Sequence, residues 1–209
     1  HLVVAGASTT KNTIFYSGTN DIDDFTSSGS GSIVIEDAVV GLASFRSDLI
    51  IFCKNSIHKL VNINNSSTVA VVPITTNVGC VSGGSIQEIG GDLLFLAPDG
   101  VRTVAGTERN SDVELGSVSR QIQSLISDIA ADSGFIITSG VLRGKSQYRL
   151  FYSKNTESPT VARGIIGTLT SNGFAWSETL GIQALGFVSD LDKDGIEQVY
   201  HGDKDGYIY

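Results

Sequence analysis

The sequence consists largely of short apolar runs that are too brief to form helices. Runs such as LVVAG, TIFYS, LIIFC, DLLFLA and QYRLFY span about five residues each, and Gly, Asn, Asp or Ser separates them. This pattern is typical of chains that fold into many short strands joined by tight turns. We therefore predict an all-β protein, and its 209 residues are enough to bury a sizeable core.

One segment departs from the β pattern. In SVSRQIQSLISDIAA, about residues 117–131, the apolar residues recur at helical spacing: Val118, Ile122, Leu125, Ile126 and Ile129. Ser117 or Ser119 is placed to cap the N-terminus of this segment. The sequence predicts one short amphipathic helix here.

The strands also repeat as a larger unit. Five segments share an apolar strand with an aromatic anchor, followed by a polar turn: IFYSGTN, IFCKNS, LFLAPDG, LFYSKNT and VYHGDKDG. The anchors are Phe15, Phe52, Phe95, Phe151 and Tyr200. A period of about 40 to 50 residues with about four strands per unit is typical of propeller blades.

We therefore predict a β-propeller-like meander of four-stranded blades. Residues 1–209 would form a single propeller domain or part of one, with a β-sandwich or a double meander as the alternative. We expect Gly79, Gly83, Gly90, Gly91, Pro98, Asp99 and Gly100 to form its turns. Because the chain has no methionine and opens with the strand-like HLVVAG, we expect it to be part of a longer protein.

The charge of the chain disfavours partners that carry many negative charges. The formal net charge is -8, and no run of Lys and Arg occurs, so nucleic-acid gripping is not expected. No run approaches the roughly 18 apolar residues of a membrane span. The two cysteines, Cys53 and Cys80, lie in apolar surroundings and are predicted to be buried, although a single disulfide remains open.

The C-terminal segment contains the candidate metal ligands. Its sequence, SDLDKDGIEQVYHGDKDGYIY, contains DKDG twice. Asp190, Asp192 and Asp194 precede Gly195 in the D-x-D-x-D-G order of calcium loops, and Glu197 follows. An EF-hand would need Glu where this chain has His201. Asp-Gly is also a turn former, so we favour hairpin turns and keep calcium binding as the alternative.

Residues with catalytic chemistry are present but form no recognisable motif. His58 and His201 accompany many Ser and Asp residues, yet neither G-x-S-x-G nor H-E-x-x-H occurs. We expect His58 to face solvent from a strand. Carboxylate pairs for glycoside hydrolysis are Asp21, Asp23 and Asp24, or Asp112 and Glu114. We read them as polar loops, expect Trp176 in a core or interface, and predict that the chain is not an enzyme.

A longer stretch resembles a known family. The segment GCVSGGSIQEIGGDLLFLAPDGVR, preceded by GLASFRSDLIIFCKNSIHKLV and followed by VYHGDKDGYIY, resembles the β-propeller part of the tail hub or nozzle proteins of short-tailed bacteriophages. These are also called tail tubular protein B or packaged-DNA stabilisation proteins. The opening LVVAGASTTKNTIFYSGTNDIDDF is similar to the first blade of that family.

The resemblance implies a structural virion protein. Such a protein forms an oligomeric conduit, usually a sixfold ring, together with other tail proteins. It retains the genome and then lets the DNA pass without sequence-specific binding. The resemblance implies a place in the virion, with the host cytoplasm as the site of assembly, and it supplies no catalytic residue or cofactor. The alternative function is a calcium-dependent carbohydrate- or receptor-binding propeller that uses Asp190, Asp192 and Asp194.

Overall fold

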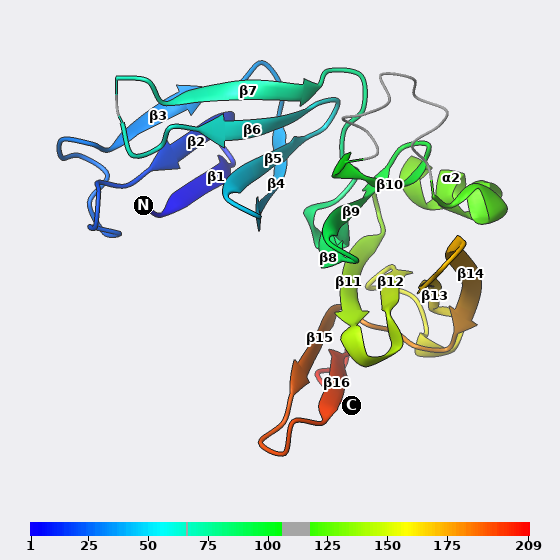
Figure 1. Cartoon of the computed structure of the whole chain (residues 1–209). Helices are drawn as coiled ribbons and strands as arrows, with labels where there is room; N and C mark the ends of the chain where they lie inside the picture. Colours follow the sequence, from blue (N-terminus) through cyan, green and yellow to red (C-terminus); the bar gives the residue numbers. More distant parts are fainter. Residues whose placement is uncertain (66, 106–117) are drawn as a thin grey trace. The chain divides into compact units, whose positions relative to one another are not determined.

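The computed structural model describes residues 1–65, 67–105 and 118–209, and Figure 1 shows their course. Strands make up 49% of the chain and helices 11%. The strands form five antiparallel sheets, in each of which the order along the sheet follows the order along the chain. The prediction of an all-β, blade-like fold is confirmed.

The chain divides into two compact units, His1–Gly83 and Gly84–Tyr209, and each is described by itself. The arrangement of all five sheets as one propeller over residues 1–209 therefore stays a prediction.

The first unit contains two sheets. The first sheet has three strands, β1 (Val3–Ala7), β2 (Thr10–Tyr16) and β3 (Gly31–Val34). The second sheet has four strands, β4 (Val39–Phe45), β5 (Asp48–Cys53), β6 (Ile57–Val61) and β7 (Ala70–Thr75).

The second unit contains three sheets. The first sheet comprises β8 (Gln87–Ile89), β9 (Asp92–Ala97) and β10 (Gly100–Thr103). The next comprises β11 (Ile136–Leu142), β12 (Gln147–Ser153), β13 (Arg163–Thr170) and β14 (Gly173–Leu180). The last comprises β15 (Gly186–Leu191) and β16 (Glu197–Gly202). Short 3-10 turns also occur, among them η1 (Gly83–Ser85), η4 (Arg143–Lys145) and η5 (Pro159–Val161).

The predicted repeat corresponds to the five sheets. In each sheet, the second strand in chain order carries one of the five aromatic anchors: Phe15 in β2, Phe52 in β5, Phe95 in β9, Phe151 in β12 and Tyr200 in β16. The number of strands varies more than the sequence predicts. Two sheets have the expected four strands, whereas the others have three, three and two among the described residues.

Two tight turns of the β8–β10 sheet form at positions that the sequence repeat predicts. Ile89 pairs with Asp92, so Gly90 and Gly91 form a two-residue loop, and their φ values of 61° and 77° suit a type I′ turn. Pro98 and Asp99 similarly connect β9 to β10, because Ala97 pairs with Gly100.

Gly79 and Gly83 differ from the prediction, because neither adopts the positive φ of a turn-forming glycine. A side chain on Gly79 would overlap the carbonyl of Lys54, and one on Gly83 would overlap the carbonyl of Val40. Both glycines therefore permit close approach of two backbone segments.

Each unit has a buried apolar interior. In the first unit, the core cluster consists of Ile14, Ile35, Ile51, Cys53 and Leu60. In the second, fully buried side chains come from the central strands, among them Phe95, Leu96, Tyr148 and Leu150. Cys53 and Cys80 are both buried, as predicted, and no disulfide joins them.

The predicted helix forms within its expected range. The 3-10 turn η3 (Arg120–Ile122) leads into α2 (Gln123–Ala131), which buries Ile126 and Ile129. Ser119 does not cap α2, because its hydroxyl accepts a hydrogen bond from the N–H of Val101 at 2.8 Å. Ser117 lies outside the described residues. No helix in the described part of the chain is long and apolar enough to cross a membrane.

An ion pair between a buried arginine and a partly exposed aspartate joins the β9–β10 turn to its own sheet. Arg102 is only 1% exposed, and its guanidinium contacts both carboxylate oxygens of Asp99, with the Nε to Oδ1 hydrogen bond at 2.9 Å. The carbonyl of Asp99 accepts a hydrogen bond from Gln123 of α2 at 2.6 Å. Asp99 thus does more than form a turn, because it neutralises a buried cation and contacts the helix.

Removal of this carboxylate is expected to destabilise the protein strongly. Asp99→Ala removes the carboxylate that pairs with the buried charge of Arg102, which should lower the unfolding free energy by about 1.5–3 kcal/mol in urea titrations. Asp194→Ala is the matched control, since its ion pair with Lys193 also lies in a hairpin turn but is largely exposed. That variant should change stability by no more than about 0.5 kcal/mol. Equal effects of the two substitutions would contradict this interpretation.

Candidate functional site

The first DKDG sequence forms the turn between β15 and β16. The Oδ1 atom of Asp192 accepts hydrogen bonds from the backbone N–H groups of Asp194 and Ile196, both at 2.9 Å. Its Oδ2 atom accepts one from the side-chain amide of Gln198 at 3.1 Å. The N–H of Ile196 and the amide of Gln198 hold the pKa of the Asp192 carboxyl below its usual value. Gly195 completes the turn with a φ of 76°.

The second DKDG sequence repeats this turn contact by contact. Asp203 Oδ1 accepts hydrogen bonds from the N–H groups of Asp205 at 2.9 Å and Tyr207 at 3.0 Å. Its Oδ2 accepts one from the hydroxyl of Tyr209 at 3.1 Å, in the place that Gln198 takes in the first copy. Gly206 has a φ of 85°. Partial desolvation opposes ionisation of Asp203, but these hydrogen bonds outweigh it and lower its pKa.

The repeat is therefore a structural turn, as the Asp-Gly signal favoured. In both copies the lysine contacts the following aspartate at 2.8 Å, so even the exposed charges repeat. The first aspartate of each motif satisfies the backbone donors that the reversal of the chain would otherwise leave to water.

The structure does not gather the three predicted calcium ligands around one point. Asp192 faces its own turn, Asp194 contacts Lys193, and Asp190 accepts the N–H of Leu191 at 2.8 Å. Among residues 1–65, 67–105 and 118–209, no group of three or more His, Cys, Asp or Glu side chains is placed to hold a metal ion. Calcium binding by this loop stays a prediction.

Glu197, which the sequence places beside the calcium motif, connects the hairpin to a distant turn. Its Oε1 atom accepts hydrogen bonds from the N–H of Arg143 at 2.6 Å and the hydroxyl of Ser189 at 3.0 Å. Its Oε2 atom accepts one from the N–H of Gly144 at 3.0 Å. The N–H of Arg143 is the main cause of the lowered pKa of Glu197. Sequence spacing gave no sign of this contact, because its partners are more than fifty residues away.

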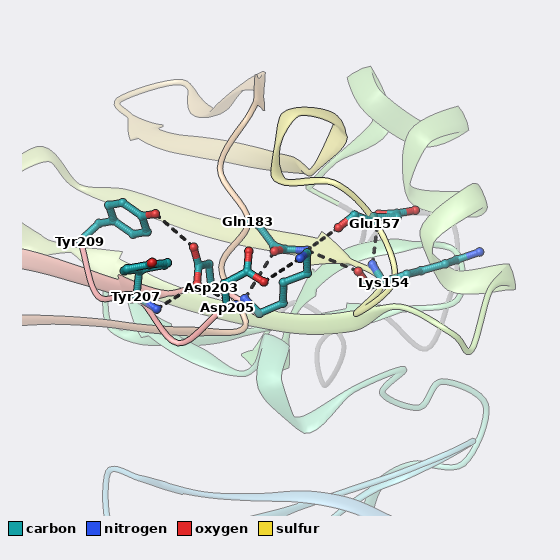
Figure 2. A network of polar contacts seen from close by, with 8 residues as sticks. Lys154, Glu157, Gln183, Asp203, Asp205, Tyr207 and Tyr209 are labelled. Atoms are coloured by element: carbon teal, nitrogen blue, oxygen red, sulfur yellow. Dashed lines mark hydrogen bonds and ion pairs between the residues drawn. The ribbon is translucent and has the colours of Figure 1, made fainter.

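The second turn is attached to its unit by a buried amide, as Figure 2 shows. Gln183 is 2% exposed and donates hydrogen bonds to the carbonyls of Lys154 at 3.4 Å and Glu157 at 3.2 Å. Its carbonyl oxygen accepts the N–H of Lys204 at 3.4 Å. The side chain of Lys193, at the same position of the first turn, is 86% exposed. The two turns therefore share a local structure but have different surroundings.

The first unit places a serine, a histidine and an aspartate together, but not in a catalytic order. The Ser56 hydroxyl donates to Asp37 at 3.1 Å and lies 2.9 Å from His58 Nε2. A catalytic triad has the histidine between serine and aspartate, whereas Ser56 stands between the other two. Asp37 also accepts the N–H groups of Ala38 and Asn55, so this cluster ties the turn between β5 and β6 to the segment before β4.

Burial changes the pKa of both His58 and the nearby thiol. Contrary to our expectation, His58 is half-buried, and this burial lowers its pKa. Burial raises the pKa of the Cys53 thiol to about 11, which keeps it protonated and unreactive at neutral pH.

Among the proposed glycosidase carboxylates, Asp24 does not have the property of a general acid. The N–H of Thr26 and further hydrogen bonds hold the pKa of Asp24 at about 2, whereas a general acid needs a raised pKa. Asp21 accepts the N–H of Asp23 at 3.2 Å, as in an ordinary polar turn. Asp112 and Glu114 lie outside the described residues.

Trp176 has a structural position in the second unit. It is half-buried, donates from Nε1 to the carbonyl of Val118 at 2.7 Å, and stacks on Phe174 with ring centres 5.5 Å apart. Its edge also faces Tyr148. These contacts agree with the expected core or interface position.

The β15–β16 sheet exposes apolar side chains on one face. Val188 pairs directly with Tyr200, and Ile208 pairs with Gly202, which lies two residues from Tyr200 and so on the same face. The exposed fractions of Val188, Tyr200 and Ile208 are 53%, 48% and 77%. We call these three residues the C-terminal apolar surface. On the opposite face, Phe187 packs inward with its ring centre 5.2 Å from that of Phe151, while Leu191 at the end of β15 is exposed.

No protein-family model matches the chain, and no curated protein matches it. The class that the fold defines is an all-β protein of blade-like antiparallel meanders.

The carboxylate of Asp192 should be needed for the fold but not for metal binding. Asp192→Ala removes the acceptor of two backbone donors and one amide, so it should lower the thermal midpoint more than Asp194→Ala does. EDTA should leave the midpoint of the unsubstituted protein unchanged in differential scanning fluorimetry. A fall of the midpoint in EDTA that calcium reverses would instead support the calcium loop.

The Glu197 contact should give a defined dependence on pH. The pKa of Glu197 in the folded protein lies below the ordinary value of 4.5, so its stabilisation is complete above that value and is lost as the pH falls through the folded pKa. Between pH 6 and pH 3, Glu197→Gln should therefore lose less stability than the unsubstituted protein. Parallel losses in both proteins would contradict this role, and amide NMR shifts of Arg143 and Gly144 would report the contact directly.

Proposed function

We propose that this chain is a structural component of a phage tail hub or nozzle, in which copies of the chain assemble into an oligomeric conduit with other tail proteins. The motifs GCVSGGSIQEIGGDLLFLAPDGVR and VYHGDKDGYIY suggest this family by resemblance. The observation that carries the proposal is the C-terminal apolar surface, because an exposed apolar face of a sheet is a typical protein–protein interface.

The geometry of the surface favours association of sheets. Val188 and Tyr200 form a cross-strand pair with their side chains on the open face of a two-stranded sheet. Such a small sheet is only marginally stable unless another layer packs against it, and here one face already packs through Phe187. Covering Val188, Tyr200 and Ile208 by a neighbouring subunit would remove their apolar area from water and stabilise both partners.

The charge of the chain suits a conduit for DNA. With a formal net charge of -8, the protein offers the phosphates little overall attraction. DNA that passes along such a surface would form few ion pairs and would slide without sequence-specific binding. The proposed place of action is the virion, with assembly in the host cytoplasm.

The polar clusters fit a structural role better than a catalytic one. Asp192, Asp203, Glu197 and Asp37 each accept backbone N–H groups, which uses their carboxylates to fix turns. Stiff hairpins are useful in a tube that must keep its shape while a polymer moves through it.

The assembly can be tested directly on the full chain. The purified protein should form rings, sixfold if the family pattern holds, in negative-stain electron microscopy and mass photometry. Tyr200→Asp places a charge in the C-terminal apolar surface and should shift the population to monomers while circular dichroism stays unchanged.

Ile22→Asp is the matched control for this test. Ile22 is 59% exposed but lies in a loop far along the chain from this surface, so its substitution should leave assembly intact. A protein that stays monomeric at all concentrations, or a Tyr200→Asp variant that assembles normally, would overturn the proposal.

A further inference from the structure

The first unit contains a groove that the proposed function does not use. Its walls are the turn between β4 and β5 and the loop that follows β6, and both contribute side chains from within residues 1–65 and 67–83. The groove has a volume of about 900 Å³. This volume lies near the upper end of the range of about 300 to 1,000 Å³ for small-molecule sites, so the space is large enough for several linked rings.

The floor of the groove is apolar. Val3, Leu42, Leu49 and Ile63 line it, and each of them also packs against the core cluster of this unit. All four are half-buried, so part of each side chain remains accessible from the groove. The floor is therefore an apolar surface, held in position by the core, on which C–H groups of a ligand can pack.

The rim of the groove is rich in uncharged polar groups. Asn62, Asn64 and Asn65 supply carboxamides, and Ser47 and Thr68 supply hydroxyls. Carboxamides and hydroxyls both donate and accept hydrogen bonds.

The charged residues of the rim are few. They are His1, Arg46 and Asp48, and the last lies 3.9 Å from Lys59. Carboxamides and hydroxyls therefore outnumber the charged groups of the rim.

Each of the two walls of this groove contains a non-glycine residue with a positive φ. Arg46 has a φ of 56° and Asn62 a φ of 57°, and each is a non-glycine residue in the left-handed region. Only four described non-glycine residues have positive φ, the others being Asn20 and Ser146. Glycine or asparagine is expected at a hairpin position like that of Arg46, so an arginine there is unfavourable for the turn itself. Strain of this kind concentrates at binding sites.

Arg46 is also held in a defined position. Its guanidinium lies over the ring of Phe45, 4.9 Å from the ring centre, although the side chain is exposed. This cation–π contact orders a long side chain at the rim and reduces the entropy that it would lose on binding a ligand.

We propose that this groove binds a sugar chain. The C–H faces of sugar rings would lie on Leu42, Leu49 and Ile63, while ring hydroxyls exchange hydrogen bonds with the rim carboxamides and accept them from Arg46. Because the ligand groups are hydroxyls, the site needs the mixed donors and acceptors of Asn62, Asn64 and Asn65 rather than a cluster of cations. The site uses no metal and is independent of the Asp190–Asp194 loop.

Isothermal titration calorimetry on the full chain tests the site. The probes are maltohexaose, cellohexaose and chitohexaose, with hexagalacturonic acid as a carboxylated counterpart. At least one should bind with a dissociation constant in the micromolar-to-millimolar range. The neutral and acidic probes distinguish a hydroxyl site from one in which Arg46 pairs with a sugar carboxylate.

Arg46→Gly separates binding from folding. It should weaken binding about tenfold, the loss expected for one hydrogen bond to a charged group, while the thermal midpoint stays equal or rises because glycine relieves the backbone. Asn64→Ala, at an exposed rim position without backbone strain, should also weaken binding. Asn20→Gly is the matched control, since Asn20 has a φ of 60° outside the groove and its substitution should leave binding unchanged.

Three results would overturn the proposal. The first is that none of the four saccharides binds at millimolar concentration. The second is that binding survives both Arg46→Gly and Asn64→Ala, which would place the ligand elsewhere. The third is that these substitutions change the oligomeric mass of the protein instead of saccharide binding, which would make the groove a subunit interface.

Discussion

The hydrogen bond from a backbone N–H to a carboxylate is the interaction on which the hairpins of this chain depend. Short strands leave many turns, and each turn leaves donors that no neighbouring strand can satisfy. Asp192 and Asp203 satisfy them within their own turns, whereas Asp37 does so for a later turn of the chain and Glu197 for an earlier one. The acidic character of the sequence is therefore in part a structural property, since the carboxylates that give the chain its negative charge also fix its loops.

Much of the fold could be predicted because its signals are local. Alternation, glycine pairs and aromatic anchors act within a few residues, so the strands, the Gly90–Gly91 turn and the five repeated units were visible in the sequence. The number of strands per sheet could not be predicted, because the hydrogen bonds that assign a strand to a sheet are not specified by a degenerate repeat. Nor did the sequence show that the Ser119 hydroxyl accepts a hydrogen bond from the N–H of Val101 instead of capping the helix.

Contacts in the candidate sites were harder to predict from the sequence than the strands. Sequence spacing grouped Glu197 with the aspartates before it, but its partners Arg143 and Gly144 come from a distant hairpin. Likewise, the spacing of Ser56 and His58 gave no sign of the order in which they meet Asp37. The groove in the first unit also brings together the β4–β5 turn and the loop after β6, and only the pairing of the strands between them places Arg46 near Asn62. The pairing of strands distant in sequence determines which side chains meet, and short sequence motifs do not specify that pairing.

The turn function of Asp192 competes with the calcium function that its sequence suggests. An ionised carboxylate has about four lone-pair sites, and three donors already occupy Asp192. A calcium ion would need an oxygen of this residue together with others from Asp190 and Asp194, which are directed to separate partners. Binding would therefore require Asp190 and Asp194 to leave their present partners and turn toward Oδ2 of Asp192, which among the described residues accepts only the side-chain amide of Gln198. The second copy, at Asp203, shows that the turn forms in the same way without the preceding aspartate of the calcium pattern, so its hydrogen bonds alone are sufficient reason for the motif.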